Sequence, residues 1–422
     1  MLYIVLNIVR ILWILSLLDL VYFLWNELMG CRKNVSDVYT NAKFEVDEVT
    51  ELNFIQGELG NCGMIASMAS LARNRELLEK IAPVNQCFNG KQSEFVFNLY
   101  KRGKPQRVVV NERLFLRNCS CLHFIFGLQK LYYSQSHNHN FIGPLLEKAL
   151  VKLHFDEKYE LSYGVPVSNV LSSLSNNFFE EFSKDGLSSL GYNLESVITH
   201  GRKYSCLMVV SFNNNNFSLH PHHAYTIIDC KKDVVNLYNP HGKHVLVPIN
   251  YFIENLNHLC ISYTGDKVFE MANVKTLKEF SDCWEELSAD KTFSCVYYLL
   301  TVEEDATEVL INIIDSYHTD VHKNIFLYSV NAKTFQAKYC DVNTSNRRTL
   351  RKKLMSGSYQ IEFMQYFAKD AHMKNVKENY SDCSKIDKNG FCFRFAASKK
   401  CTVKKIYSRE DLTIEDMNLN IR

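Results

Sequence analysis

The chain has 422 residues, which is enough for two or three domains. Hydrophobic residues make up 46% and charged residues 22%, a composition typical of a globular protein with a buried core and unlike that of a disordered chain. The 48 Lys and Arg residues nearly balance the 46 Asp and Glu residues, so no bulk field favours nucleic acid or an acidic substrate.

Cysteines are numerous but irregularly spread. The 14 cysteines include no C-x-x-C pair, and the one close pair, Cys119 and Cys121, is separated by a single residue. This spacing argues against a zinc ribbon and against a dense disulfide framework. We therefore expect free thiols in a reducing compartment, and a cytoplasmic protein.

The first segment of the chain, residues 2–29, is strongly apolar. Arg10 and Asp19 interrupt it, and a central charge opposes membrane insertion by about 2.5–3.5 kcal/mol. No small-residue cleavage site follows, which argues against a signal peptide. The segment predicts a membrane anchor or an interfacial helix. The alternatives are a helix packed on the body of the protein and a wrongly assigned start.

The next segments predict a mixture of helix and strand. The polar stretch from Cys31 to Val49 is typical of a linker, and residues 60–81 carry apolar side chains at helical spacing up to Pro83. Residues 95–116 alternate as strands do around a Lys-Arg-Gly-Lys-Pro turn. Residues 144–153 form one apolar helical face, with Pro144 suited to its first turn.

The second half of the chain is dominated by predicted strands. The polar, Gly- and Ser-containing residues 180–200 suggest a hinge, and the four short apolar runs after it suggest an antiparallel sheet. Beyond residue 271 spaced strands with alternating faces continue, and Phe391, Phe393 and Phe395 are expected on one side of a strand. This last region predicts a β-sandwich.

One cysteine has the surroundings of a nucleophile. Cys62 stands at the predicted start of a helix, where the helix dipole favours a thiolate. Gly57 and Gly60 allow a close approach of the backbone to a substrate. The side-chain amide of Gln56 and the backbone N–H of Cys62 could together bind an oxyanion. Most cysteines at such positions are structural, so the assignment depends on partners elsewhere.

Candidate partners lie far downstream, as a thiol protease requires. His223 follows Cys62 by 161 residues and opens a predicted strand, and Asn239 ends the next one. Two adjacent strands would bring these side chains together, so that the amide holds the imidazole and its other nitrogen faces the thiol. We therefore predict Cys62 as nucleophile, His223 as general base and Asn239 as the orienting residue.

These residues lie in segments that resemble the calpain family. Residues 54–82 resemble its active-site block, and PLLEKALVKLHFDEKYEL its LLEKAYAKL-type helix. HHAYTI and YNPHG resemble the strand and turn that carry the catalytic His and Asn, RVVVNERL the edge of the first sheet, and LMSGSYQIEF and FCFRF the following β-sandwich. The likeness covers roughly residues 44–400 in order, and its pattern maps onto Gln56, Cys62, His223 and Asn239.

The resemblance implies an α+β fold: a papain-like, two-subdomain cysteine protease core followed by an all-β sandwich, with endopeptidase activity on protein substrates. The implied organisation is an apolar helix at 1–30, a linker at 31–43, a subdomain with Cys62 at 44–190, a subdomain with His223 and Asn239 at 191–270, a β-sandwich at 271–405 and a tail at 406–422.

Several positions depart from the family pattern. Gly63 and His241 replace two tryptophans beside the triad, which removes apolar area from the cleft, and His222 replaces a glycine. Asn53 stands where the family has an acidic calcium ligand, and the acidic stretch after the Asn-Pro turn is missing. No EF-hand pattern occurs. We expect no required cofactor, and calcium only as a regulator whose sites are degraded.

Two other readings stay open on the sequence. A calpain homologue that binds partners without cutting them fits the lost tryptophans but not the intact triad. A zinc site could use Cys62 with the crowded histidines, although their spacing fits no standard motif: His220, His222, His223, His241 and His244. A nucleotide enzyme is not indicated, because no P-loop or G-x-G-x-x-G pattern occurs.

Overall fold

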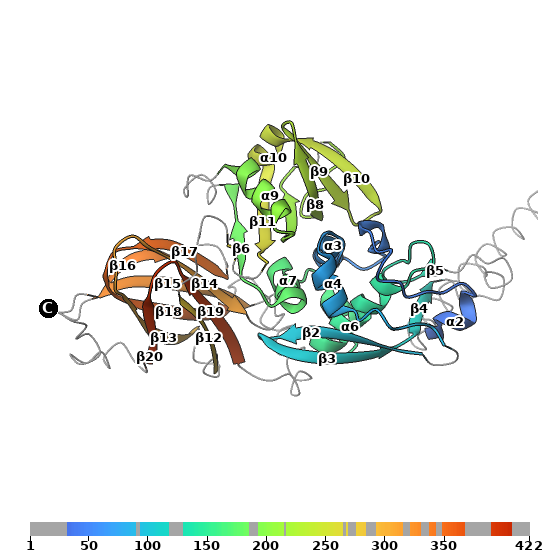
Figure 1. Cartoon of the computed structure of the whole chain (residues 1–422), viewed down its shortest axis with the longest axis horizontal. Helices are drawn as coiled ribbons and strands as arrows, with labels where there is room; N and C mark the ends of the chain where they lie inside the picture. The colour runs from blue at the N-terminus through green and yellow to red at the C-terminus, as the bar shows by residue number, and fades with distance from the viewer. Residues whose placement is uncertain are drawn as a thin grey trace, which may run out of the picture.

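A computed structural model gives the arrangement of the chain (Figure 1). It describes residues 32–89, 93–117, 130–184, 193–214, 217–264, 267–268, 276–283, 293–314, 321–330, 337–342, 348–367 and 390–406. The apolar segment 2–29 and residues 407–422 of the predicted tail lie outside this range. Among the helices that the structure describes, none has the length and hydrophobicity needed to cross a membrane.

The first part of the described chain is mainly helical and is built around one buried helix. That helix, α3 (Cys62–Ser70), is buried from Met64 to Ser70 and has no proline or β-branched run to interrupt it. Around it lie α2 (Val35–Val38), η1 (Glu51–Asn53), η2 (Leu71–Arg73), α4 (Arg75–Ile81), α6 (Ile142–Phe155), η3 (Tyr159–Ser162) and α7 (Val167–Ser175). The helices predicted within residues 60–81 and 144–153 are therefore confirmed, the first with a break at Asn74.

Two small antiparallel sheets complete this part. Strands β2 (Glu94–Lys101) and β3 (Lys104–Asn111) form a hairpin whose turn residues, Arg102 and Gly103, both have positive φ, as a tight hairpin turn requires. The second sheet has the order β1-β4-β5, from β1 (Arg32–Asn34), β4 (Arg113–Arg117) and β5 (Lys130–Leu131).

The second part is a six-stranded antiparallel sheet in the order β10-β9-β8-β7-β11-β6. Its strands are β6 (Phe179–Phe182), β7 (Leu207–Phe212), β8 (Ala224–Lys231), β9 (Val234–Asn239), β10 (Lys243–Pro248) and β11 (Leu256–Ser262). The helices of this part are α9 (Leu194–Lys203) and α10 (Ile249–Asn255). Most of its apolar side chains form a core cluster that also includes Leu310 and Ala396 from further along the chain. The four apolar runs predicted as strands are confirmed as β7 to β10.

The third part consists of two antiparallel sheets. One has the order β12-β19-β14-β17, from β12 (Thr276–Cys283), β14 (Thr307–Ile314), β17 (Thr349–Leu354) and β19 (Gly390–Ala397). The other has the order β16-β15-β18-β13-β20, from β13 (Phe293–Val302), β15 (Val321–Val330), β16 (Ala337–Val342), β18 (Gly357–Phe367) and β20 (Cys401–Ile406). Buried side chains from both sheets, Phe363 and Phe393 among them, belong to one apolar cluster.

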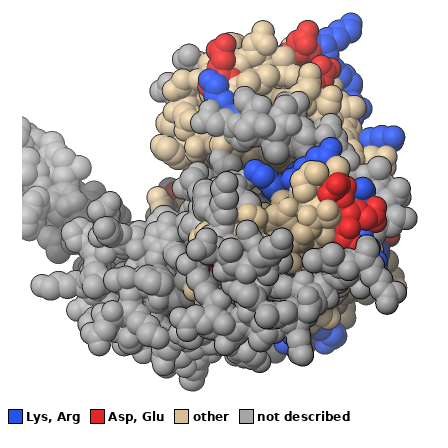
Figure 2. Space-filling view, turned by 90° about the vertical axis from the view of Figure 1, so that its left-hand side faces the viewer, with Lys and Arg blue, Asp and Glu red and all other residues tan. Residues whose placement is uncertain are grey.

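Side-chain hydrogen bonds join the three parts. Helix α3 lies between α6 and the six-stranded sheet (Figure 1), and the Thr226 hydroxyl of β8 donates to the Ala66 carbonyl at 2.7 Å. On the other side, the buried Asn312 of β14 exchanges two hydrogen bonds with the backbone of Phe179 in β6. Acidic and basic side chains are intermixed on the described surface of the face in Figure 2.

Two segments differ from the sequence-based expectation. The stretch predicted as a linker carries β1 and α2 and buries Val35, Phe44 and Val46, because its few apolar residues pack under β4 and the hairpin. The predicted hinge at 180–200 contains β6 and most of α9. Strand β6 precedes residue 191 but pairs with β11, so the six-stranded sheet includes residues that were expected in the first subdomain.

Candidate active site

Cys62 is the first residue of α3, and the loop before it is fixed at several points. The Gln56 N–H donates to the Pro240 carbonyl at 2.8 Å, and the Glu58 N–H donates to the Tyr132 carbonyl at 3.1 Å. The chains run so close together here that a Cβ on Gly57 would lie 1.6 Å from the Tyr133 carbonyl oxygen. A glycine is therefore required at this position, and the loop has little freedom to move the nucleophile.

His223 and Asn239 meet on adjacent strands of the six-stranded sheet. The Nε2 atom of His223 lies 3.0 Å from Oδ1 of Asn239, and both side chains are buried. The backbone N–H of His241 donates to the same Oδ1 atom at 3.0 Å, so this end of the amide must be the oxygen. Oδ1 can only accept, and Nε2 therefore carries the proton, which leaves Nδ1 with the lone pair that a general base needs.

The sulfur of Cys62 reaches the beginning of β8. A backbone hydrogen bond from Ala224, the residue after His223, stabilises the thiolate form, as do the backbone N–H groups at the start of α3. Burial is the larger influence and raises the pKa of the Cys62 thiol. The structure thus brings Cys62, His223 and Asn239 to one place, at the junction of α3 with the six-stranded sheet.

The resting pair is neutral. Burial lowers the pKa of His223 to about 4, against the hydrogen bond to Asn239, and the neighbouring rings of His241 and His220 lower it further. Burial thus disfavours the charged form of both the Cys62 thiol and the His223 imidazole. The helix dipole was expected to favour a thiolate, but desolvation of the sulfur outweighs it in this structure.

Gln56 lies in the nucleophile loop but its amide nitrogen is already engaged. Nε2 donates to the Leu59 carbonyl at 2.6 Å, within the same loop. The Oε1 atom is buried and forms no hydrogen bond with any described residue. The amide nitrogen of Gln56 has a second N–H in addition to the one that donates to Leu59, and this second N–H can donate to a bound group. The role of Gln56 as an oxyanion donor stays a prediction.

Two of the five crowded histidines, His241 and His220, lie beside the proposed base, His223. The ring of His241 is parallel to that of His223, with centroids 4.9 Å apart, and His220 lies edge-on to both. His222 is exposed with a φ of 57°, and His244 is directed toward Glu51 and Asn236. Within the described residues no three His, Cys, Asp or Glu side chains are arranged to hold a metal ion, so the geometry gives the zinc alternative no support.

His223 was predicted to open a strand, but β8 begins only at Ala224, and both His222 and His223 lie just before it. The alternation of side chains along a strand therefore does not apply to these two residues. The left-handed backbone of His222 and the turn bond from the His223 N–H to the His220 carbonyl separate the two side chains instead.

Comparison with known proteins agrees with this geometry. The family model described as "Calpain family cysteine protease" matches residues 32–247, which is half of the chain. The chain belongs to the calpain family of cysteine proteases. Human calpain-14 is 26% identical over 233 residues, which cover 50% of this chain and 31% of the relative.

Two further relatives show the same limits of the match. Human calpain-12 is 36% identical over 124 residues, covering 29% of this chain and 16% of the relative. The calpain-1 catalytic subunit of Rattus norvegicus is 26% identical over 229 residues, covering 50% of this chain and 30% of the relative. These alignments span less than a third of the length of each of these calpains. Cys62, His223 and Asn239 all lie within the residues that the family model matches.

Proposed function

We propose that this chain is a calpain-like cysteine endopeptidase in which Cys62 is the nucleophile, His223 the general base and Asn239 the residue that orients the base. One observation carries the proposal. His223 is held by Asn239 at 3.0 Å in the tautomer that leaves Nδ1 unprotonated, and the backbone N–H of the next residue, Ala224, favours the thiolate form of Cys62. This geometry supports proton transfer from the Cys62 thiol to Nδ1 of His223.

The neutral resting pair makes His223 a general base in the attack. As the sulfur attacks the carbonyl carbon of a peptide bond, Nδ1 takes the thiol proton and the carbonyl oxygen becomes an oxyanion. The imidazolium then gives this proton to the amine nitrogen as the C–N bond breaks, which leaves a thioester on Cys62. Water, deprotonated by His223, hydrolyses the thioester and restores the thiol.

The oxyanion would form beside the start of α3. The backbone N–H of Cys62 is one donor that a developing negative charge can use, because it lies at the positive end of the helix. The second N–H of Gln56 is our candidate for the other donor, with the bond to Leu59 holding the amide in place. Two donors of this kind contribute several kcal/mol to the stabilisation of a tetrahedral intermediate, at about 3–4 kcal/mol each.

The distribution of the site over two structural parts supports a papain-like layout. A helical part supplies the nucleophile at the start of α3, and an antiparallel sheet supplies the base and the orienting residue from β8 and β9. Such a site lies at the junction of the two parts, where an extended peptide can bind. We propose protein substrates, and a β-sandwich formed by the two C-terminal sheets.

Calcium is not required in this proposal. Asn53 offers a neutral amide, and its Oδ1 atom already accepts the Thr50 N–H at 2.8 Å in a capping interaction. Calcium affinity depends on the number and charge of the oxygen ligands, so this position is a weak one for calcium. The near balance of 48 Lys and Arg against 46 Asp and Glu residues supports the expectation that nucleic acid is not a partner. A cytoplasmic location and membrane binding through residues 2–29 remain proposals.

Alkylation with an irreversible thiol-directed epoxide, mapped by mass spectrometry, tests the proposal. Cys87 is an exposed free cysteine in the same chain and serves as the internal reference. We expect Cys62 to react faster than Cys87, with or without calcium, and we expect the difference to disappear in His223→Ala. The Cys62→Ala variant should cleave no peptide. A wild-type Cys62 that reacts no faster than Cys87 would favour a homologue that binds partners without cutting them.

A further inference from the structure

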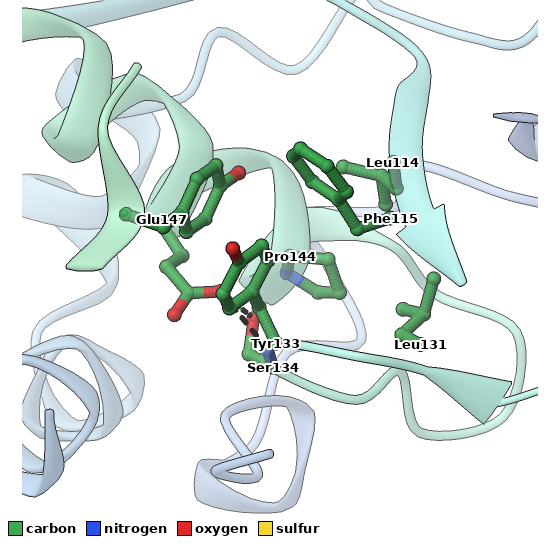
Figure 3. Close-up of a pocket in the computed structure, with 8 residues that line it drawn as sticks. Leu114, Phe115, Leu131, Tyr133, Ser134, Pro144 and Glu147 are labelled. Carbon is green, nitrogen blue, oxygen red and sulfur yellow. Dashed lines mark hydrogen bonds between the residues drawn. The ribbon is translucent and has the colours of Figure 1, made fainter. Parts of the chain in front are cut away.

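A buried carboxylate lies directly behind the nucleophile. Glu147 of α6 is 1% exposed, and three donors converge on it. The Asn61 side-chain amide donates to Oε1 at 2.7 Å, and the backbone N–H and hydroxyl of Ser134 donate to Oε2 at 2.9 and 2.7 Å. Figure 3 shows the bonds between Glu147 and Ser134 beneath Tyr133 and Pro144. Glu147 takes no part in the proton transfers proposed above.

The surroundings of Glu147 show that it is not a ligand site. Its two oxygens accept three hydrogen bonds, and among the described residues no Lys or Arg forms an ion pair with it. Burial raises the pKa of the Glu147 carboxyl, and the bonds from Ser134 and Asn61 oppose this by stabilising the carboxylate. The rings of Tyr133 and Tyr159 stack on each other beside Glu147, with their centroids 3.8 Å apart. The cavity that these residues line has a volume of about 10 Å³. That space holds no more than about one water molecule. Burying an anion in such a place opposes folding, so its contribution must be sought in the bonds it makes.

One of those bonds comes from Asn61, the residue before Cys62. Asn61 is the residue at the N-terminal cap of α3, and its carbonyl accepts the N–H groups of Met64 and Ile65. Its side chain makes no capping bond to the helix, although asparagine is well suited to that role, and is directed to Glu147 instead. The position of Asn61, and with it the first turn that carries the sulfur, is thus set from α6.

The same carboxylate ties a second segment to the nucleophile loop. Two backbone hydrogen bonds join residues 132–135 to the loop before Cys62. The Glu58 N–H donates to the Tyr132 carbonyl, and the Gln135 N–H donates to the Ile55 carbonyl at 2.8 Å, so that Ser134 lies between them. Glu147 bonds Ser134 with one oxygen and Asn61 with the other. It therefore closes a third link between these segments, from the interior of the protein.

We propose that Glu147 is a positioning residue for the nucleophile, which acts through Asn61 and Ser134 to hold Cys62 against the His223–Asn239 pair. The inference rests on the proposed function, in which that pair takes the thiol proton. This positioning role requires a side chain with two acceptor oxygens, each facing a donor on a different segment. Only a carboxylate of this length meets that requirement, because an amide presents one oxygen and one NH₂ group.

The test compares Glu147→Gln with a matched control. In Glu147→Gln an NH₂ group faces either Asn61 or Ser134, and one of these links breaks. We expect the alkylation rate of Cys62 and kcat for a peptide to fall by about 10- to 100-fold, with a smaller change in KM. The control is Glu112→Gln, since Glu112 is also fully buried and accepts the N–H groups of Ser36 and Ser93 far from the loop. It should lose stability but keep the alkylation rate of the folded protein.

A second variant separates positioning from general damage. Combining Asn61→Asp with Glu147→Gln reverses the polarity of one bond, so that the Gln NH₂ donates to the new carboxylate while its oxygen accepts from Ser134. We expect this pair to restore most of the lost alkylation rate and peptide cleavage. If Glu147→Gln reacts at the wild-type rate, or if the pair restores nothing while Glu147→Gln remains folded, the inference is wrong.

Hydrogen exchange keeps the inference testable if the protein does not cut peptides. Peptides covering residues 56–68 should exchange faster in Glu147→Gln than in the wild type, because the first turn of α3 loses its anchor, and Glu112→Gln should leave them unchanged. Unchanged exchange in Glu147→Gln would overturn the positioning role. A wild-type Cys62 that reacts no faster than Cys87 would instead overturn the proposed function alone.

Discussion

His241 stacks face to face on His223, with the ring centroids 4.9 Å apart and the ring planes 7° from parallel. Its backbone N–H also donates to the Asn239 oxygen that accepts His223. One residue therefore covers the base with its ring and fixes the orienting amide with its backbone. Because this ring is an imidazole, it can itself be protonated.

The ionisable cover should be visible in the pH dependence of the thiol. His241 lowers the pKa of His223 because a positive charge on one ring disfavours a positive charge on the other. His241→Phe keeps a flat ring and the backbone N–H but removes this influence, so we expect the pKa of His223 to rise above its value of about 4. The alkylation rate falls as His223 becomes protonated, and its acidic limb should therefore move to higher pH.

The measurement is the epoxide alkylation rate of Cys62 between pH 3.5 and 8, chosen around the cited pKa of about 4. His244→Phe is the control, since His244 is exposed and interacts with Glu51 and Asn236 rather than with the base. An acidic limb that stays in place, or moves to lower pH in His241→Phe, would contradict the electrostatic role of the stack.

Folding stability should also depend on His223. Its pKa is about 4 in the folded chain and about 6.5 when unfolded, so the unfolded chain binds the proton first as the pH falls. The contribution of His223 to the unfolding free energy is therefore fully present above pH 6.5. It is lost as the pH falls from 6.5 to about 4, by on the order of 3 kcal/mol. Buried His154, whose pKa is also lowered by burial, acts in the same direction.

Urea unfolding at several pH values checks this expectation. His223→Asn should reduce the loss of unfolding free energy between pH 6.5 and 4, whereas His222→Asn, at an exposed position, should leave it unchanged. The same slope in the wild type and in His223→Asn would show that another group carries the proton uptake.

Local pattern and family likeness together gave much of the fold. Helix α6 was predictable because Leu145, Leu146, Ala149 and Leu150 recur at helical spacing, and all four are buried. Strands β7 to β10 of the six-stranded sheet were predictable because apolar runs alternate with polar turns. The three proposed catalytic residues were selected by likeness and spacing, and the structure brings them together.

Features that depend on contacts between distant segments were out of reach. Nothing local in residues 179–182 indicates that β6 adds to the sheet of the second part, and the bond from Asn61 to Glu147 joins residues 86 positions apart. A Glu within the apolar run PLLEKAL was the one available signal of a buried carboxylate. The neutral state of Cys62 and His223 follows from burial, which a sequence does not contain.

The turn before the base offers a test of backbone strain. His222 is exposed and has a φ of 57°, a conformation that costs a side-chain residue more than glycine. His222→Gly should therefore raise the free energy of unfolding by up to about 1 kcal/mol and leave the alkylation rate of Cys62 unchanged. His222→Ala removes the same ring but keeps the strain, and should give no gain. A loss of alkylation in His222→Gly would mean that the ring contributes to the site.

The apolar segment at residues 1–30 lies outside the described residues, and we expect it to bind membranes without being needed for folding. Deletion of residues 1–30 should give a chain with an unchanged melting temperature that no longer floats with lipid vesicles. Deletion of residues 1–38 removes β1, which pairs with β4, together with buried Val35, and should cost about 2 kcal/mol or more. Aggregation of the shorter deletion would show that the segment packs on the core.

A buried ion pair joins β6 to β17 of the C-terminal sheets, and we expect the stability of the protein to depend on it. Arg351 of β17 binds Glu180 of β6 through two bonds of 2.7 and 2.8 Å, and the Tyr263 hydroxyl donates to the same carboxylate at 2.5 Å. Both charged side chains are more than nine-tenths buried. Arg351 also pairs with the partly exposed Glu308 at 2.6 Å, so Arg351→Met removes the cation from that carboxylate and from the buried carboxylate of Glu180. We expect this to lower the unfolding free energy by about 3–5 kcal/mol, mainly because Glu180 is left as a buried charge without its cation.

Calorimetry with a double-mutant cycle resolves the origin of that loss. Adding Glu180→Gln to Arg351→Met removes the stranded charge and should recover most of the stability, because a neutral pair avoids the desolvation of an ion. Lys80→Met, which breaks the exposed pair with Glu76, should leave the melting temperature unchanged and serves as the control. If the double variant is no more stable than Arg351→Met, the arginine stabilises the contact by packing and not by its charge.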